Sequence, residues 1–285
     1  MQKKLIVLFA AVFLIIATTL YLTLIRQNEQ PIILFSRSAV VMSVRTGEIL
    51  FEKDMNLPMP PASTAKLMGI LLVLEEIHQS RLTLDEIVII SEEAANIRAS
   101  RAGFVVGDAV SVDNLIMGVM LPSGSEAVMA LGEHIFGNEA AFVHAMNERA
   151  AELGMIDTYF TNSVGLHNPE NLSTAYDLAI LARYLLQNHP EIINYSSRPG
   201  YTFEASETEK TEQNIMHMRN TNDLLMRIPG ITGLKTGSGQ WVGFNLVGSY
   251  SDGRNGRRDF IFVLIGAAES ALRRIDSELL IERFR

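Results

Sequence analysis

The chain has 285 residues, 48% of them hydrophobic and 20% charged, which suits one sizeable folded domain and argues against a disordered protein. Its formal net charge is −8, whereas nucleic-acid-binding proteins carry an excess of basic residues, so no nucleic-acid partner is expected. The absence of cysteine excludes disulfide bonds, thiolate catalysis and cysteine-ligated metal sites.

The N-terminal segment predicts export. Lys3 and Lys4 precede an uncharged stretch of about 21 residues, Leu5 to Ile25, close to the ~20 residues that span a bilayer as a helix. A signal peptide has a shorter apolar core and a small-residue cleavage site, and such a site is poorly formed here. We therefore expect residues 1–30 to form a cytoplasmic stub, an uncleaved membrane anchor and a linker. Residues 31–285 are then expected outside the cytoplasmic membrane, in the periplasm or at the cell surface, or secreted if the segment is cleaved.

The remaining residues predict an α+β domain. In chain order we expect a β-hairpin at residues 38–54, a long buried helix at 62–80, and two clear helices at 140–154 and 173–189. Two strands at 241–250 and 259–267 and an amphipathic helix at 270–284 are expected to follow. Because strand patterns lie at both ends and helical patterns fill the middle, we expect an antiparallel sheet built from both ends of the domain and flanked by helices. A helical subdomain is inserted in the middle.

Ser63 and Lys66 lie at the start of the long apolar helix, in the stretch PPASTAKLMG. Residues three apart on a helix are neighbours, about 5–6 Å apart at Cβ. A serine hydroxyl becomes nucleophilic when a base takes its proton. Desolvation by the apolar residues that follow Lys66 can lower the pKa of its amine enough for it to be that base. Taken alone, this Ser-x-x-Lys pattern is better explained by a capping serine beside a snorkelling lysine.

Two later stretches complete an ordered set of motifs. LPSGSEA places Ser123 and Ser125 in a short loop between apolar helical segments, and GLKTGSG places a Lys-Thr-Gly triplet at Lys235, where a strand pattern begins. Ser-x-x-Lys, Ser-Gly-x and Lys-Thr-Gly in this order indicate a penicillin-binding protein or a class A β-lactamase. A phosphate-binding loop is disfavoured because Leu234, rather than glycine, precedes Lys235.

Through these motifs the chain resembles the low-molecular-mass penicillin-binding proteins, the serine D-alanyl-D-alanine carboxypeptidase family, from about Arg37 to its end. The stretches TGEILFEKDMNLPMPPASTAKLM, LSTAYDLAILARYL, NTNDLL and GLKTGSGQWVGFNLV carry the same resemblance. It implies a β-lactamase/transpeptidase-like fold and removal of the terminal D-alanine from peptidoglycan stem peptides that end in D-Ala-D-Ala. It also implies that no cofactor is needed and that β-lactam antibiotics are covalent inhibitors.

The resemblance further implies a role for each motif residue. Ser63 is the nucleophile that forms the acyl-enzyme, Lys66 is the general base, and Ser123 relays a proton toward the leaving D-alanine. The backbone N–H groups of Ser63 and Ser238 are expected to form the oxyanion hole. The expected substrate-binding residues, of which the lysine and the threonine hold the terminal carboxylate, are Ser125, Lys235, Thr236, Gly237 and Ser238.

The chain departs from the family pattern at Ser125, where asparagine is usual. An asparagine side chain can bond the catalytic lysine and the substrate together, whereas a serine hydroxyl is shorter. Losing one such hydrogen bond costs about 1–3 kcal/mol, roughly a 5- to 150-fold loss of rate. Two alternatives therefore remain beside the carboxypeptidase. One is a D,D-endopeptidase with the same machinery, and the other is a weakly active or non-catalytic cell-wall-binding homologue.

Other candidate residues receive structural explanations. Glu126 could act as a base for deacylation, although a carboxylate in the first turn of a helix is the simpler explanation. His134 and His144 lie on helical patterns without the HExxH spacing of zinc peptidases, so no metal site is expected.

Overall fold

The computed structural model describes residues 31–253 and 259–285, together with residues 14, 16 and 18. It divides into two units, residues 1–34 and residues 35–285. The expected membrane anchor, Leu5 to Ile25, lies almost entirely outside the described residues. Among the residues that are described, no helix has both the length and the apolar character needed to cross a bilayer.

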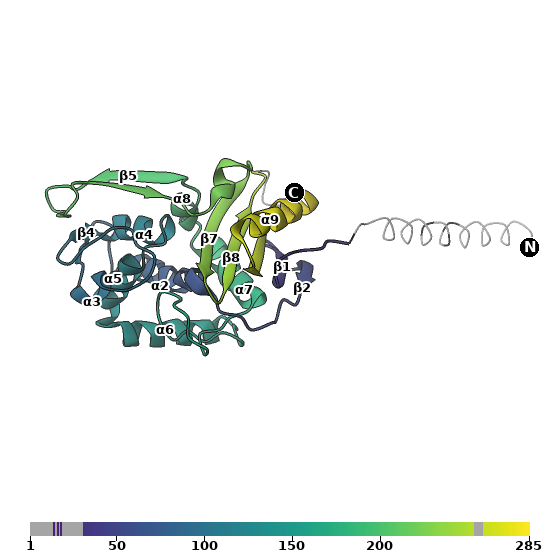
Figure 1. Cartoon of the computed structure of the whole chain (residues 1–285), viewed down its shortest axis with the longest axis horizontal. Coiled ribbons are helices and arrows are strands. Elements are labelled where there is room, and N and C mark those ends of the chain that lie inside the picture. The colour runs from purple at the N-terminus through teal and green to yellow at the C-terminus, as the bar shows by residue number, and fades with distance from the viewer. Residues whose placement is uncertain (1–13, 15, 17, 19–30, 254–258) are drawn as a thin grey trace, which may run out of the picture. The chain divides into compact units, whose positions relative to one another are not determined.

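The second unit is built on a five-stranded antiparallel sheet in the order β2-β1-β9-β8-β7 (Figure 1). Its strands are β1 (Ser38–Ser43), β2 (Ile49–Lys53), β7 (Ile231–Gly239), β8 (Gly243–Tyr250) and β9 (Phe260–Ala267). β1 pairs with β9, with Val40 opposite Val263, so the first and last strands of the unit lie side by side. The expected sheet, built from both ends of the domain, is confirmed.

Helices α7 (Ala175–Asn188) and α9 (Ser270–Phe284) pack against this sheet. All residues of β9 except Gly266 are buried, because a strand covered on both faces has no solvent side. The Asp276 carboxylate of α9 accepts hydrogen bonds from the backbone N–H groups of Phe35 and Ser36, at 2.9 and 2.7 Å. The start of the folded unit is thereby attached to its last helix.

In chain order, a helical region lies between β2 and β7. It contains α2 (Lys66–His78), α3 (Glu92–Ala95), α4 (Val112–Met120), α5 (Ser125–Phe136), α6 (Glu139–Glu152) and α8 (Ile192–Ser196). α2 packs against α5, α6 and α7, and its residues from Lys66 to Leu74 are all buried. The expected helix at 62–80 is thus a short 3₁₀ turn, η1 (Ala62–Ala65), followed by α2, while the other expected helices agree within two residues. A second 3₁₀ turn, η2 (Asp223–Met226), precedes β7.

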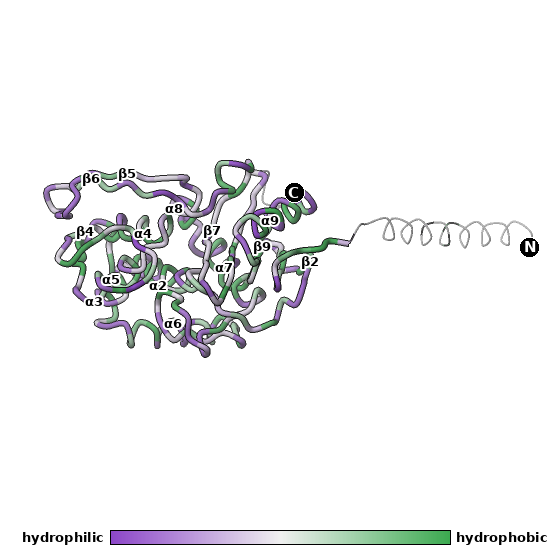
Figure 2. Tube along the Cα trace, viewed as in Figure 1, coloured by the Kyte–Doolittle hydropathy of each residue, from purple (hydrophilic) through white to green (hydrophobic). Residues whose placement is uncertain are grey.

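Two small two-stranded sheets were not expected from the sequence: β3 (Ile87–Ile89) with β4 (Ala109–Ser111), and the hairpin of β5 (Gly200–Glu204) with β6 (Ile215–Arg219). Figure 2 shows that the tip between β5 and β6 is hydrophilic. Along β6 alternate side chains are buried, so only one face of this hairpin packs on the protein. Such short, half-exposed strands give a weak periodic signal.

Candidate active site

The turn that carries Ser63 is held from several sides. The Thr64 hydroxyl donates to the Pro61 carbonyl at 2.7 Å, and the Asn245 amide of β8 donates to the Pro60 and Pro61 carbonyls, both at 3.1 Å. Ser63 itself stays partly exposed. The nucleophile candidate is therefore fixed to the sheet by its neighbours while its own hydroxyl remains accessible.

The Lys66 side chain is completely buried one helical turn from Ser63. Its Nζ lies 3.0 Å from Ser63 Oγ, 2.7 Å from the Ser123 carbonyl oxygen, 3.3 Å from Ser123 Oγ and 3.1 Å from Ser100 Oγ. The first two motifs thus meet at one amine. The fourth partner, Ser100, belongs to neither.

Burial lowers the pKa of Lys66 well below its usual value, and the nearby positive charge of Lys235 lowers it further. The Glu126 carboxylate acts in the opposite direction. Desolvation penalises the charged form of an amine, so the apolar walls of α2 favour the neutral lysine. This is the protonation state that a general base requires.

Ser123 lies between α4 and α5 with a left-handed backbone, φ +68°. This conformation is uncommon for a residue other than glycine and is often found at functional sites. It lets both the carbonyl oxygen and the hydroxyl of Ser123 face Lys66. The same carbonyl oxygen accepts a 2.6 Å hydrogen bond from the Ser100 hydroxyl.

Ser125 is fully buried, and its hydroxyl lies 3.4 Å from that of Ser100. Within the described part of the chain, the hydrogen bonds of Lys66 go to Ser63, Ser100 and Ser123 and do not include Ser125. Ser125 therefore contacts Lys66 indirectly, through Ser100. The direct contact comes from a segment that the motif pattern does not mark.

Glu126 holds the segment that follows Ser100. Its Oε1 accepts hydrogen bonds from three successive backbone N–H groups, those of Ala102, Gly103 and Phe104, at 2.7, 2.8 and 3.2 Å. The side chain is completely buried. These contacts support the structural explanation of Glu126 over the deacylation base, since its Oε1 is occupied by backbone donors.

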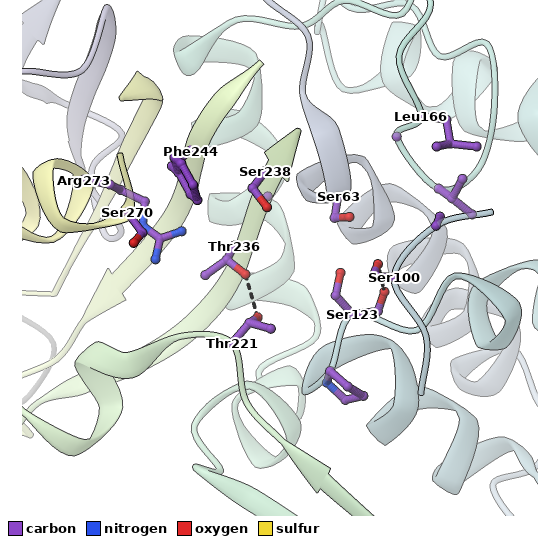
Figure 3. A pocket seen from close by; sticks show the side chains of 15 residues that line it. Ser63, Ser100, Ser123, Leu166, Thr221, Thr236, Ser238, Phe244, Ser270 and Arg273 are labelled. Carbon is purple, nitrogen blue, oxygen red and sulfur yellow. Dashed lines mark hydrogen bonds between the residues drawn. The ribbon is translucent and has the colours of Figure 1, made fainter. Parts of the chain in front are cut away.

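The third motif lies along β7. Lys235 is buried, its Nζ donates to the Thr236 carbonyl at 3.3 Å, and burial together with the charge of Arg273 lowers its pKa to about 7. The Thr236 hydroxyl lies 2.6 Å from that of Thr221 (Figure 3). A Cβ on Gly237 would lie 3.0 Å from the Pro61 carbonyl oxygen. The absence of a side chain at Gly237 therefore lets β7 approach the turn that carries Ser63.

These residues surround a hollow of about 480 Å³. In Figure 3 the hydroxyls of Ser63, Ser123, Thr236 and Ser238 face the same space, and the Arg273 guanidinium borders it from α9. Apolar parts of the wall come from Val164, Leu166 and Phe244. The hollow thus combines a nucleophile, hydroxyl donors, a cation and an apolar wall.

A loop at residues 162–166 closes one side of the hollow. The Asn162 side chain accepts hydrogen bonds from the backbone N–H groups of Gly165 and Leu166, at 2.8 and 2.9 Å. Gly165 has φ +81°, and a Cβ there would lie only 1.9 Å from the Ala62 carbonyl oxygen. This position therefore requires glycine, because the loop lies directly against the turn that carries Ser63.

Sequence reasoning missed Ser100, Thr221 and Arg273. Arg273 is buried in the first turn of α9, where a cation opposes the helix dipole, and this unfavourable placement was its one local signal. Its Nη1 donates to the Asn245 carbonyl at 3.3 Å. Ser100 carried no local signal, because serine is an ordinary loop residue. Thr221 lies within the stretch NTNDLL, which carries the resemblance, but no role was assigned to it.

Comparison with known proteins identifies the family to which the chain is similar. A family described as D-alanyl-D-alanine carboxypeptidase matches residues 26–269. D-alanyl-D-alanine carboxypeptidase DacF of Bacillus subtilis is 35% identical over 202 residues, which is 71% of this chain and 50% of DacF. DacD of Escherichia coli is 34% identical over 247 residues, 84% of this chain and 60% of DacD. The chain thus spans about half to three fifths of the length of these relatives.

Two further relatives broaden the comparison. A D-alanyl-D-alanine endopeptidase of Pseudomonas aeruginosa is 32% identical over 193 residues, 67% of this chain and 59% of that protein. The crystal structure of penicillin-binding protein D2 from Listeria monocytogenes in its ampicillin-bound form matches 89% of this chain and 98% of that one. The TM-score is 0.76 at 30% sequence identity, so the α+β fold is shared.

Proposed function

The chain belongs to the D-alanyl-D-alanine carboxypeptidase family, and we propose that it is a serine D,D-carboxypeptidase acting on peptidoglycan stem peptides that end in D-Ala-D-Ala. The observation that carries this proposal is the 3.0 Å contact between Ser63 Oγ and the Nζ of the buried Lys66. A family match supplies the substrate class. The contact supplies the chemistry, because it joins a nucleophile to a base.

A count of protons explains how Lys66 is oriented. A neutral amine has two N–H donors and one lone pair. The Ser123 carbonyl accepts one N–H at 2.7 Å. The Ser100 hydroxyl has a single proton, which it donates to the Ser123 carbonyl, since a carbonyl can only accept. Toward Lys66 the Ser100 oxygen must therefore be the acceptor, and it accepts the second N–H of the amine at 3.1 Å. The lone pair remains for the proton of Ser63.

Acylation then follows from these positions. Ser63 Oγ bonds to the carbonyl carbon of the penultimate D-alanine while its proton passes to Lys66. The tetrahedral oxygen is held by the backbone N–H groups of Ser63 and Ser238. When the C–N bond breaks, Ser123 Oγ, 3.3 Å from Lys66 Nζ, relays a proton to the leaving D-alanine nitrogen. Water attacks the resulting ester, with Lys66 again as base, and frees Ser63.

The terminal carboxylate of the substrate is assigned to Thr236 and Arg273, which border the hollow, together with the buried Lys235 next to Thr236 in β7. A guanidinium and a hydroxyl are strong donors to a carboxylate. An incoming anion also raises the pKa of Lys235 from its value of about 7 in the free enzyme. Substrate binding therefore restores the charge of this lysine. β-Lactam antibiotics carry the same carboxylate, and we assign them to the same hollow as acylating inhibitors.

Ser100 bears on the alternative of an inactive homologue. Ser125 is shorter than the usual asparagine, but the Ser100 hydroxyl supplies the direct hydrogen bond to Lys66. This contact favours an active enzyme. A D,D-endopeptidase uses the same machinery, and the two activities differ in how much of a cross-linked peptide the cleft admits.

We further propose that residues 5–25 hold the enzyme at the outer face of the cytoplasmic membrane. The length and apolar character of this segment support the proposal. A substrate in the cell wall also requires that the enzyme be either anchored at the outer face of the membrane or secreted. Fractionation of cells and mass measurement of the mature chain test this proposal. A full-length chain in the membrane fraction is expected, whereas a soluble chain without residues 5–25 would contradict it.

The function is tested by labelling with a fluorescent penicillin and by release of D-alanine from a pentapeptide. Wild type is expected to label and to release D-alanine, and Ser63→Ala to do neither. Ser197→Ala is the matched control, since Ser197 donates to a backbone carbonyl in α8. A wild type without a covalent adduct on Ser63 would refute the proposal. Cleavage of a cross-linked dimer in preference to the pentapeptide would identify the endopeptidase instead.

A further inference from the structure

Three side chains of metal-binding type converge at the end of α2 opposite to Lys66, roughly 18 Å along the helix axis. His78 is the last residue of α2. His189 directly follows the last residue of α7, and Glu191 directly precedes α8. Pro190 separates these two residues and interrupts the helical conformation between α7 and α8. Nothing in the proposed catalytic mechanism uses these three residues.

The three donor atoms are close enough to share one ion. His78 Nε2 lies 2.7 Å from Glu191 Oε1, and His189 Nδ1 lies 3.5 Å from the same oxygen. All three atoms lie within 4.8 Å of one another. Ligands of a tetrahedral zinc ion, each about 2.1 Å from the metal, lie roughly 3.3 Å apart. The half-exposed His78 side chain has the freedom for the small adjustment that this geometry needs.

Hydrogen bonding does not account for this convergence. Among the described residues, neither Glu191 Oε1 nor His189 Nδ1 makes a well-aligned hydrogen bond, although both atoms are buried and the oxygen lies within ion-pair distance of both imidazoles. His189 is only 4% exposed. A buried polar atom without a partner is costly, and a cation between the three donors would satisfy both atoms at once.

The surroundings favour a cation. His78 and His189 border a surface hollow that is also lined by Glu75, Arg149 and Glu152. Arg149 is already bound by these two carboxylates, with hydrogen bonds of 2.7 Å to each. The charge of Arg149 is thereby already balanced, and Glu191 adds a further carboxylate beside the two histidines.

We propose that His78, His189 and Glu191 bind a zinc ion. Two imidazoles and one carboxylate suit a borderline cation such as Zn²⁺ better than Mg²⁺ or Ca²⁺, which prefer oxygen ligands. The open side at His78 leaves a fourth position for water. The ion connects the end of α2 to the α7–α8 junction, and it stabilises the arrangement of these helices without entering the peptidase reaction.

Titration of the metal-stripped full chain with Co²⁺, a coloured substitute for Zn²⁺, tests the site. One ion per chain with the visible absorption of tetrahedral Co²⁺ is expected, displaced by Zn²⁺. His78→Asn and Glu191→Gln are expected to abolish that absorption. The matched control is His134→Asn, because His134 Nε2 also lies 2.7 Å from a glutamate, Glu86, but no third ligand joins this pair within the part of the chain that the structure describes. This control is expected to bind Co²⁺ as wild type does.

Thermal unfolding gives a second readout that is independent of activity. At a hundredfold excess of Zn²⁺ over its Kd, wild type and His134→Asn are expected to gain roughly 5 °C in Tm, and His78→Asn to gain none. No binding by wild type, or binding and stabilisation that survive in His78→Asn and Glu191→Gln, would overturn the proposal. Penicillin labelling of Ser63 is expected to be unchanged in all four proteins, so failure of this site would not affect the proposed function.

Discussion

Replacing Ser100 with alanine removes one hydroxyl beside Lys66 and leaves all three sequence motifs intact. In the wild type this hydroxyl accepts an N–H of Lys66 at 3.1 Å and donates to the Ser123 carbonyl at 2.6 Å. Without it, one N–H of the neutral amine loses its acceptor at 3.1 Å and keeps only the longer contact to Ser123 Oγ, at 3.3 Å. The amine can then turn that N–H toward Ser63, which directs its lone pair away from the proton it must accept.

The expected magnitude follows from the hydrogen bond that the substitution removes from Lys66. One hydrogen bond to a buried polar group is worth about 1–3 kcal/mol when its partner is left unsatisfied. If this falls on the transition state for acylation, the rate constant decreases roughly 5- to 150-fold. Ser125→Ala removes only the 3.4 Å interaction with Ser100 and is expected to slow acylation by less than about fivefold.

The assay is the second-order rate constant for acylation by a fluorescent penicillin, measured across pH. Tm is measured in parallel, and Ser197→Ala is the matched control, because it removes a serine hydroxyl that donates to a carbonyl remote from the hollow. Ser100→Ala is expected to lower the rate constant at every pH, with a Tm within a few degrees of the control. A rate equal to that of the wild type, or a larger loss in Ser125→Ala than in Ser100→Ala, would refute the assignment of Ser100 as the residue that orients Lys66.

Three further predictions concern the hollow and its charges. Arg273→Gln is expected to lower kcat/KM for a pentapeptide roughly 10- to 150-fold through loss of a charged hydrogen bond, and equal activity of both proteins would contradict its role at the carboxylate. In the wild type kcat/KM is expected to rise with pH as Lys66 loses its proton and to fall above about pH 7 as Lys235 loses its own. Because Arg273 lowers the pKa of Lys235, Arg273→Gln should move this fall in kcat/KM to higher pH. A fall at the same pH in both proteins would exclude the coupling between Arg273 and Lys235. Gly165→Ala is expected to lower the acylation rate more than about tenfold, since its Cβ would meet a backbone carbonyl oxygen at 1.9 Å. The control is Gly154→Ala, at φ +79° with open space around it, which should lose only about 1 kcal/mol of stability and no activity. Equal acylation by these two glycine variants would show that the loop does not constrain Ser63.

The fold and the three motifs were predictable because their signals are local. The apolar run after Lys66 and the strand patterns at both ends of the domain depend only on neighbouring residues, and the structure confirms the sheet and the helices that they predict. The sheet of β3 and β4 was missed because these strands have three residues each, too few for a periodic pattern.

The zinc ligands show the same limit. The absence of an HExxH pattern excludes one arrangement of ligands on a single helix. It does not address ligands from separate helices. His78 and His189 are distant in sequence, and their approach depends on how α2 packs against α7.

By itself, the sequence determined which chemical groups are available: a serine one turn before a lysine in apolar surroundings, a Ser-Gly-Ser loop and a Lys-Thr-Gly strand. Only the tertiary structure decided how the protons are shared among them. Ser100, 34 residues from Lys66 along the chain, becomes its hydrogen-bond partner, and Arg273 of the last helix borders the same hollow. The physical reason is that hydrogen bonds and desolvation act over a few ångströms in space, whatever the separation along the chain.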